Sequence, residues 1–264
     1  MKIAILDLYD SHANEGMRCI KELISANLDA IEYSVFDVRG KGELPDLSFD
    51  AYISSGGPGD PTEYNQLWSD AWAAWITSLL VFNQENSHKK KYALLICHSF
   101  QLMCCQLKIG KTSLRHSPSF GILPVHLTSD GLADPILSGL NDPFYTVDSR
   151  SFQVLAGSDE IEEPYKILAI EKERSYVSYE RAIMAVRFSD EIIGTQFHPE
   201  ADPIGMGLYF KQPAKQAQII AEHGQVKYSE MMNSLYDPER LSKTYSSIIP
   251  SFLEIVYQHS AVKL

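Results

Sequence analysis

The segment at residues 92–101 reads YALLICHSFQ and decides the fold. Its first five residues form an apolar run, which predicts a short strand buried on both faces, as in the interior of a parallel sheet. The following residues can open a helix, so Cys97 would stand at a sharp turn from strand to helix. A side chain at such a turn projects clear of the sheet, beside backbone N–H groups that can hold an anion.

The residues before this segment repeat the same pattern. Strands are expected at residues 2–8, 30–38 and 51–54, with helices near residues 14–27 and 66–82 between them. Alternating strands and helices predict a parallel sheet covered on both faces, with the functional loops at the carboxyl ends of the strands.

The second half of the chain has short strands separated by turns, so this part of the sheet is expected to be partly antiparallel. The expected strands are residues 122–127, 144–147, 167–170, 182–188 and 192–195. Helices are expected at residues 213–223, 227–235 and 238–258, the last with Asp237 as its cap.

Composition excludes several classes of protein. The chain has 264 residues, 45% of them hydrophobic, which suits one α/β domain with an appendage. Its formal net charge of -11 disfavours nucleic acid or an anionic membrane as a partner. Strand-like residues begin at Lys2 and no apolar run approaches the ~18 residues of a membrane span, so we expect a cytoplasmic protein without a signal peptide. The four cysteines show neither a disulfide framework nor metal-site spacing.

A second motif follows the strand expected at residues 192–195. Residues 196–200 read QFHPE, which places the His198 imidazole and the Glu200 carboxylate at the end of that strand. Taken alone, Cys97 could equally be a small buried residue, and a single histidine such as His198 at a strand end is more often structural. Together the two motifs favour a triad in which His198 activates Cys97 and Glu200 orients the imidazole.

A glycine-rich stretch, SSGGPGDP at residues 54–61, follows the strand expected at residues 51–54. Glycines permit backbone conformations that aim N–H groups into a site. An ordinary Gly-Pro turn and a phosphate-binding loop are the alternatives. The phosphate alternative is the weaker, because Pro58 has no N–H and the P-loop lysine is missing.

These motifs resemble those of the class I glutamine amidotransferases of the GMP-synthase type, in which the turn reads G-x-C-x-G and a His-Pro-Glu motif follows later in the chain. Cys97 and Gln101 match that turn, whereas Leu95 and Ser99 stand where the family usually has glycine. The glycine-rich stretch resembles the family's G-G-P-G loop.

The resemblance covers roughly residues 2–200 and resumes in the final helix. It implies a flavodoxin-like α/β fold, with a mixed, mostly parallel sheet and helices on both faces. Residues 1–202 would form the amidotransferase domain. Residues 203–264 would form a C-terminal helical extension packed on it, with the final helix within the core fold.

The resemblance also implies roles for individual residues. Cys97, His198 and Glu200 would be the catalytic triad, and the backbone N–H groups of Gly57 and His98 would form the oxyanion hole. The remaining residues would line the substrate pocket: Gly59, Gln101, Arg150, Ser151 and Phe152. Arg150 stands where the family usually has histidine, and its side chain would either bind a substrate carboxylate or lie exposed in a loop. The His98 side chain is expected to face solvent or a loop.

The implied reaction is hydrolysis of the glutamine side-chain amide through a cysteinyl thioester, giving glutamate and ammonia, with no metal or organic cofactor. A γ-glutamyl peptidase or amidase on the same fold and a non-catalytic regulatory protein are the alternatives. No synthetase segment is recognisable, so ammonia would pass to a partner synthetase or to water. Residues 203–249 would cover the mouth of the site, dock a partner, or simply wrap around the domain.

Overall fold

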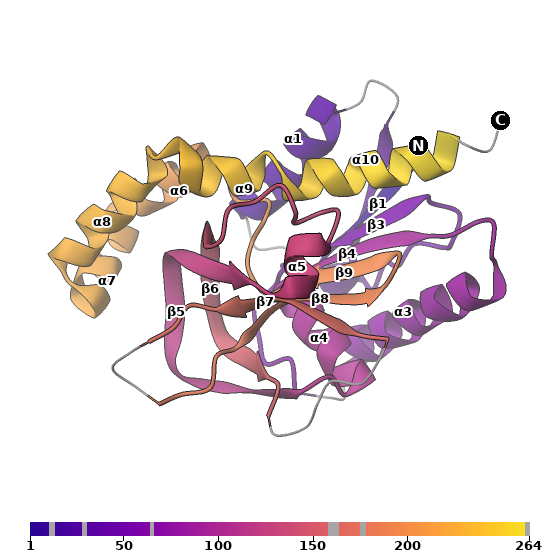
Figure 1. Ribbon diagram of the computed structural model, residues 1–264, viewed down its shortest axis with the longest axis horizontal. Helices are drawn as coiled ribbons and strands as arrows, with labels where there is room; N and C mark the ends of the chain where they lie inside the picture. The colour runs from indigo at the N-terminus through magenta and orange to yellow at the C-terminus, as the bar shows by residue number, and fades with distance from the viewer. Residues whose placement is uncertain (11–13, 28–30, 64–65, 158–163, 175–177, 262–264) are drawn as a thin grey trace.

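The computed structural model describes residues 1–10, 14–27, 31–63, 66–157, 164–174 and 178–261. One nine-stranded sheet runs through the molecule in the order β2-β1-β3-β4-β9-β8-β7-β5-β6. Helices flank the part of the sheet that contains β1, β3 and β4, and a helical arm extends beyond the β5 end (Figure 1). The predicted mixed sheet with helices on both faces is confirmed.

The first five strands in the spatial order pair in parallel. They are β2 (Glu32–Asp37), β1 (Lys2–Asp7), β3 (Ala51–Ser54), β4 (Tyr92–Ile96) and β9 (Ile192–Thr195). Burial is complete along β4, where Leu94 belongs to the apolar cluster on one face and Leu95 to the cluster on the other. The carboxyl ends of these strands share one edge of the sheet, as parallel pairing requires.

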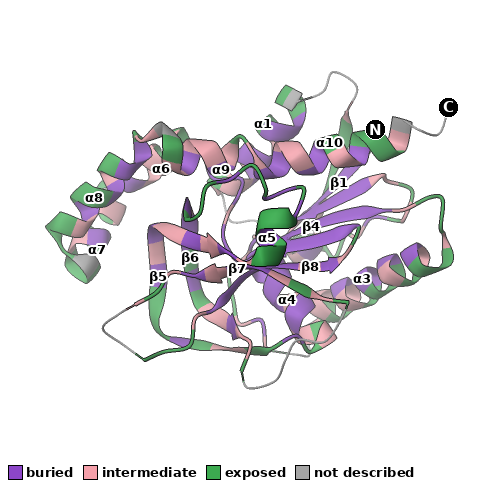
Figure 2. Ribbon diagram, viewed as in Figure 1, coloured by how far each residue is buried: buried purple, intermediate pink, exposed green. Residues whose placement is uncertain are grey.

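Each face of the parallel half carries a pair of helices. One pair is α1 (Glu15–Asn27) and α10 (Ile248–Ala261), which contact each other and bury Ile20 and Phe252 in the first cluster. The other is α3 (Leu67–Glu85) and α4 (His98–Leu107), whose apolar side chains join the second cluster. The short helix α2 (Val38–Lys41) follows β2. Figure 2 shows the buried residues concentrated in the strands between these helices.

The antiparallel half contains β5 (Lys111–Leu127), β6 (Phe144–Leu155), β7 (Lys166–Glu171) and β8 (Ile183–Ser189), with the short helix α5 (Ser129–Ala133) after β5. The predicted antiparallel character is confirmed. The predicted strands 122–127 and 144–147 are shorter than the observed strands β5 and β6, which pair with each other over a much longer stretch. Residues 148–152, expected as a loop, therefore lie within β6.

The C-terminal helices follow β9. They are α6 (Pro203–Lys211), α7 (Pro213–His223), α8 (Gln225–Leu235), η1 (Pro238–Ser242) and α9 (Lys243–Tyr245). The prediction of a single helix over residues 238–258 is wrong. The helical backbone breaks at Arg240, with φ −99° and ψ −110°, and the separate helix α10 starts at Ile248. Buried side chains of the arm, such as Phe210 and Met231, pack against Ile122 and Val147 of the sheet. No helix in the described part of the chain is long and apolar enough to cross a membrane.

Candidate active site

The turn between β4 and α4 holds Cys97 in an unusual backbone conformation. Its φ of 51° and ψ of −98° lie in a region that residues other than glycine rarely adopt. The backbone N–H donates to the Thr195 carbonyl at 2.7 Å, and the carbonyl accepts the first bond of α4 from Gln101. Strain of this kind persists only where the surroundings hold it, and it is typical of functional turns. The Cys97 side chain is thereby held at the helix N-terminus, as the sequence predicts.

The two departures from the family's turn pattern do not prevent this geometry. Leu95 is fully buried in the apolar cluster that contains Phe100 and Trp72, so its side chain adds to the core. Ser99 is also fully buried. Its hydroxyl accepts from the Ile96 N–H at 2.9 Å and donates toward the Ser54 carbonyl at 2.7 Å. Ser99 therefore joins the turn to the strand end that leads into the glycine-rich stretch.

His198 and Glu200 follow β9, and His198 lies near Cys97, since a Cβ at Gly56 would be within 3.5 Å of both side chains. The His198 backbone N–H donates to the Val147 carbonyl at 2.9 Å, which ties this segment to β6. The His198 Nδ1 lies 2.8 Å from Glu200 Oε1, and the Glu200 side chain is only 1% exposed. Burial alone would lower the pKa of His198. The charges of Glu200 and Cys97 and hydrogen bonds to both outweigh burial and raise that pKa well above its usual value.

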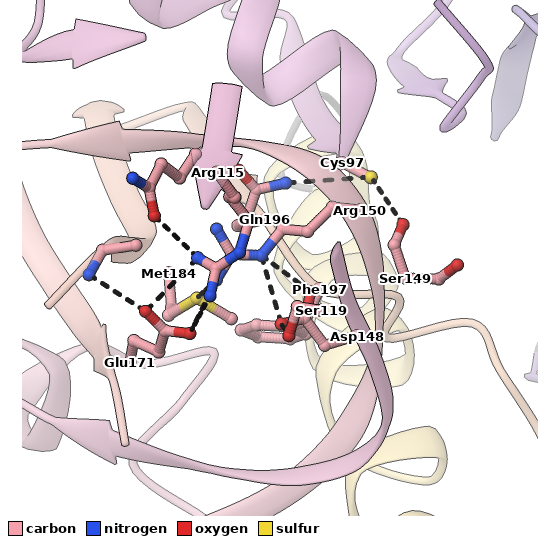
Figure 3. A network of polar contacts seen from close by, with 12 residues as sticks. Cys97, Arg115, Ser119, Asp148, Ser149, Arg150, Glu171, Met184, Gln196 and Phe197 are labelled. Atoms are coloured by element: carbon pink, nitrogen blue, oxygen red, sulfur yellow. Dashed lines mark hydrogen bonds and ion pairs between the residues drawn. The ribbon is translucent and has the colours of Figure 1, made fainter. Parts of the chain in front are cut away.

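Gln196 is a member of the site that the sequence analysis did not assign. Its side-chain amide donates toward Cys97 Sγ at 3.8 Å and accepts from Gln101 Nε2 at 3.0 Å. On the other side, Cys97 Sγ lies 4.0 Å from the Ser149 carbonyl (Figure 3). The Gln196 side chain therefore links Gln101 to Cys97. The signal that could have found Gln196 is its spacing of two from His198, because alternate residues of an extended segment point to one side.

The glycine-rich stretch packs directly against His198 and Cys97. A Cβ at Gly56 would lie 2.9 Å from His198 Cε1, and a Cβ at Gly57 would lie 2.4 Å from the Leu8 carbonyl oxygen. Both positions therefore require glycine. The Arg39 guanidinium hydrogen-bonds the Pro58 carbonyl and lies 4.3 Å from the Trp68 ring centroid, which fixes the outer part of the stretch.

The His98 side chain does not face solvent, so that part of the expectation is wrong. The residue is 2% exposed, and its ring centroid lies 6.0 Å from that of Trp68. Burial and the nearby Arg39 charge lower the pKa of His98 to about 4. The ring is therefore neutral near pH 7, and it does not provide a second cation beside Cys97.

Arg150 is buried in β6, so the expectation of an exposed arginine in a loop is also wrong. Its guanidinium donates to the Asp148 carboxylate at 2.9 Å and lies 3.3 Å from Glu171 Oε1. Glu171 also pairs with Arg115 at 2.9 Å, and Figure 3 shows this network beneath the nucleophile. Because the guanidinium already has two carboxylate partners, we do not assign it to a substrate carboxylate. The residue still lines the cavity described below.

One cavity of about 500 Å³ opens at Cys97. The predicted site residues that line this cavity are Gly57, Gly59, Cys97, His98, Gln101, Arg150, Ser151 and Phe152. His198 and Glu200 are not among the lining residues. The opposite wall comes from the C-terminal arm, through Tyr209 of α6 and Lys215, Gln218, Ile219 and Glu222 of α7. Among the described residues, no group of three or more His, Cys, Asp or Glu side chains could hold a metal ion.

Comparison with known proteins agrees with this geometry. The family model "Glutamine amidotransferase class-I" matches residues 4–211. A glutamine amidotransferase from Thermotoga maritima superposes with a TM-score of 0.68 at 13% identity, covering 97% of each chain. No curated protein matches the sequence significantly.

Two further structures have the same fold. A protein from Thermoplasma acidophilum that is assigned to GMP synthase gives a TM-score of 0.58 at 15% identity and covers 100% of this chain and 97% of its own. The glutaminase domain of Trypanosoma brucei CTPS, solved with bound acivicin, gives a TM-score of 0.55 at 12% identity, with coverage of 96% and 94%. At such identities the likeness concerns the fold.

Proposed function

Because the chain belongs to the class I glutamine amidotransferase family, we propose that it hydrolyses the side-chain amide of glutamine to glutamate and ammonia. The observation that carries the proposal is the arrangement of three side chains. Cys97 occupies the strained turn at a helix N-terminus. A Cβ at Gly56 would lie within 3.5 Å of both His198 and Cys97, so these two side chains are neighbours, and Glu200 holds His198 at 2.8 Å. This is the nucleophile, base and orienting carboxylate that acyl transfer requires.

In the first half of the proposed reaction, the Cys97 thiolate attacks the amide carbon and forms a tetrahedral oxyanion. The C–N bond then breaks as His198 donates its proton to the nitrogen, which leaves as ammonia. The product on the enzyme is a γ-glutamyl thioester. The raised pKa of His198 keeps a proton available for the leaving nitrogen.

In the second half, water attacks the thioester. His198, now neutral, takes a proton from the water, and the Cys97 thiolate leaves as the second tetrahedral intermediate collapses to glutamate. Glu200 keeps the imidazole in one orientation and stabilises its charge, without carrying a proton itself. Its buried position and its 2.8 Å contact with Nδ1 support this role.

We assign the oxyanion hole to the backbone N–H groups of Gly57 and His98. The tight approach of Gly57 to Leu8 fixes the stretch, and His98 is the first residue of α4. Removing one such donor elsewhere costs about 10²- to 10³-fold in turnover. The substrate wall would be formed by Gly59, Gln101, Arg150, Ser151 and Phe152, which all line the cavity.

We also propose that a separate synthetase accepts the ammonia when one is present, and that water does so otherwise.

The four cysteines are free thiols. Free thiols suit the reducing cytoplasm, which we propose as the location.

A second candidate function is that of a γ-glutamyl amidase acting on larger compounds, supported by the volume of the cavity, about 500 Å³.

A steady-state assay on the full chain tests the proposal. Glutamine should give equal amounts of glutamate and ammonia, and Cys97→Ala should lose about 10⁴-fold or more of that rate. The control is Cys105→Ala, which removes a thiol outside the cavity. Glutamine turnover by Cys97→Ala at the parent rate, or no turnover of any γ-glutamyl amide by the parent, would refute the proposed function.

A further inference from the structure

The cavity is lined by three charged residues, Arg150, Lys215 and Glu222. The Arg150 side chain is 1% exposed and paired with Asp148 and Glu171. Lys215, on α7, has no carboxylate within ion-pair distance among the residues that the structure describes. It is therefore the cavity cation whose charge is not already balanced by a neighbouring acid.

The packing of α7 directs Lys215 toward the cavity. Ile219 of this helix is 4% exposed and packs in the apolar cluster with Ile122 and Phe210. Lys215 lies four residues before Ile219 and Glu222 three residues after it, so all three share one face of the helix. The face that attaches α7 to the domain is therefore also the face that lines the cavity.

The ammonium group of Lys215 is held from two sides. Its Nζ lies 5.3 Å from the centroid of the Tyr209 ring and donates to Gln218 Oε1 at 3.4 Å. Gln218 in turn donates to Glu222 Oε1 at 3.0 Å, so the amide stands between the cation and the acid. Lys215 and Glu222 are seven residues apart, which is about 10 Å along a helix. The half-buried ammonium is thus oriented by neutral groups, and it keeps a donor for a ligand.

We propose that Lys215 binds a carboxylate of the substrate, and that α7 is therefore part of the active site. This inference rests on the proposed function and names a specificity residue for it. Two carboxylates have the required chemistry: the α-carboxylate of the γ-glutamyl group, and a carboxylate on the leaving amine of a γ-glutamyl amino acid. The cavity, about 500 Å³, falls within the range of ~300–1,000 Å³ typical of sites for ligands larger than one amino acid.

Kinetics of the Lys215→Met variant of the full chain test the inference. Methionine keeps the apolar stem against Tyr209 and removes the charge. We expect KM to rise about tenfold with kcat within twofold, because one charge-assisted hydrogen bond is lost in a partly open site. Lys215→Arg should restore most of the affinity. The matched control is Lys211→Met, which removes an exposed charge at the end of α6 and should leave KM unchanged.

Three substrates distinguish the two carboxylates. Glutamine and γ-glutamylmethylamide have the α-carboxylate alone, whereas γ-glutamylglycine adds a carboxylate on the leaving amine. An equal rise in KM for all three assigns Lys215 to the α-carboxylate. A rise for γ-glutamylglycine alone assigns it to the leaving group. Unchanged KM values for all three would overturn the inference.

A binding measurement separates this inference from the proposed function. Calorimetry of γ-glutamylglycine with Cys97→Ala needs no turnover, so it remains informative if the parent hydrolyses nothing. Adding Lys215→Met should weaken the Kd about tenfold, equivalent to about 1.4 kcal/mol. An unchanged Kd, or no binding to Cys97→Ala at millimolar concentration, would count against Lys215 as the carboxylate partner.

Discussion

The residues of the proposed triad and the α7 wall of the cavity are held in place in different ways. Cys97 and His198 are fixed by the backbone of the sheet, since the Cys97 N–H bonds to β9 and the His198 N–H bonds to β6. Among the described residues of α7, Ile219 is buried and Ile220 packs partly buried against the same apolar cluster, whereas the side chains of Lys215 and Gln218 are partly or fully exposed. The comparison teaches that, in the proposed roles, α7 adds a recognition surface that does not support the Cys97 turn, so changes in α7 can alter substrate choice without moving Cys97.

The comparison predicts its largest effect for the base. His198→Ala should lower kcat by about 10⁴-fold or more, because the thiol loses both its proton acceptor and the donor for the leaving nitrogen. Steady-state ammonia release measures this loss, with circular dichroism as a check on folding. A loss of similar size in Lys215→Met would break the distinction between the triad and the α7 wall.

Glu200→Gln should cost less, about 10²- to 10³-fold, since the imidazole survives and only its orientation and charge stabilisation are lost. The pH profile provides a sharper readout. Glu200 raises the pKa of His198, and the protonated ring must donate to the leaving nitrogen. Removing the carboxylate lowers that pKa, so the alkaline limb of kcat/KM should move to lower pH. A limb that stays in place would show that another group sets the pKa of His198.

Ser99→Ala tests how the turn is supported. The buried hydroxyl bonds the Ile96 N–H and the Ser54 carbonyl, so its removal leaves both without this partner. We expect the free energy of unfolding to fall by about 1–3 kcal/mol, and kcat to fall about tenfold as the nucleophile loosens. Urea denaturation and glutamine kinetics measure the two effects. Parent-like values in both would mean that the backbone alone holds the turn.

Ile219→Ala should have the smallest effect on kcat, which we expect to stay within about twofold. Loosening α7 should instead raise KM about threefold to tenfold, because the wall loses its buried anchor and cavity formation destabilises the arm. Kinetics of Ile219→Ala beside Ile204→Ala, which removes an exposed apolar side chain of α6, make the matched comparison. A fall in kcat without a rise in KM would place α7 in the chemistry.

Four strands of the parallel half, β1, β3, β4 and β9, were predictable because they are largely apolar and buried, whereas β2 is largely exposed. In β4, every residue is buried, which leaves a clear local signal. In β5 and β6 the strands continue through exposed polar residues such as Lys111 and Ser151, where backbone pairing determines the structure and no hydrophobic pattern marks it. Residues 203–264 were expected to be helical, but no separate helix was predicted at α6, where Asp202 caps the helix and Pro203 starts it.

The positions of Cys97 and His198 at strand ends were easier to predict than the wall of the cavity. Cys97 and His198 each lie at the end of a recognisable strand, so local sequence suffices to find them. The burial of Arg150 depends on Glu171. The wall at Lys215 depends on Ile219, which packs in the apolar cluster that also contains Ile122 of β5. Contacts of this kind join segments far apart in the chain, and no local pattern reports them.

Selective alkylation tests the central claim, a triad built on Cys97, most directly. A substoichiometric glutamine-like electrophile should label Cys97 first, because its turn and its imidazole partner activate it. Burial raises the pKa of Cys19 to about 12 and that of Cys104 well above its usual value, so both should react slowly. Peptide mapping by mass spectrometry should show Cys97 modified in step with the loss of ammonia release. First labelling of Cys19, Cys104 or Cys105, with activity retained, would contradict the account.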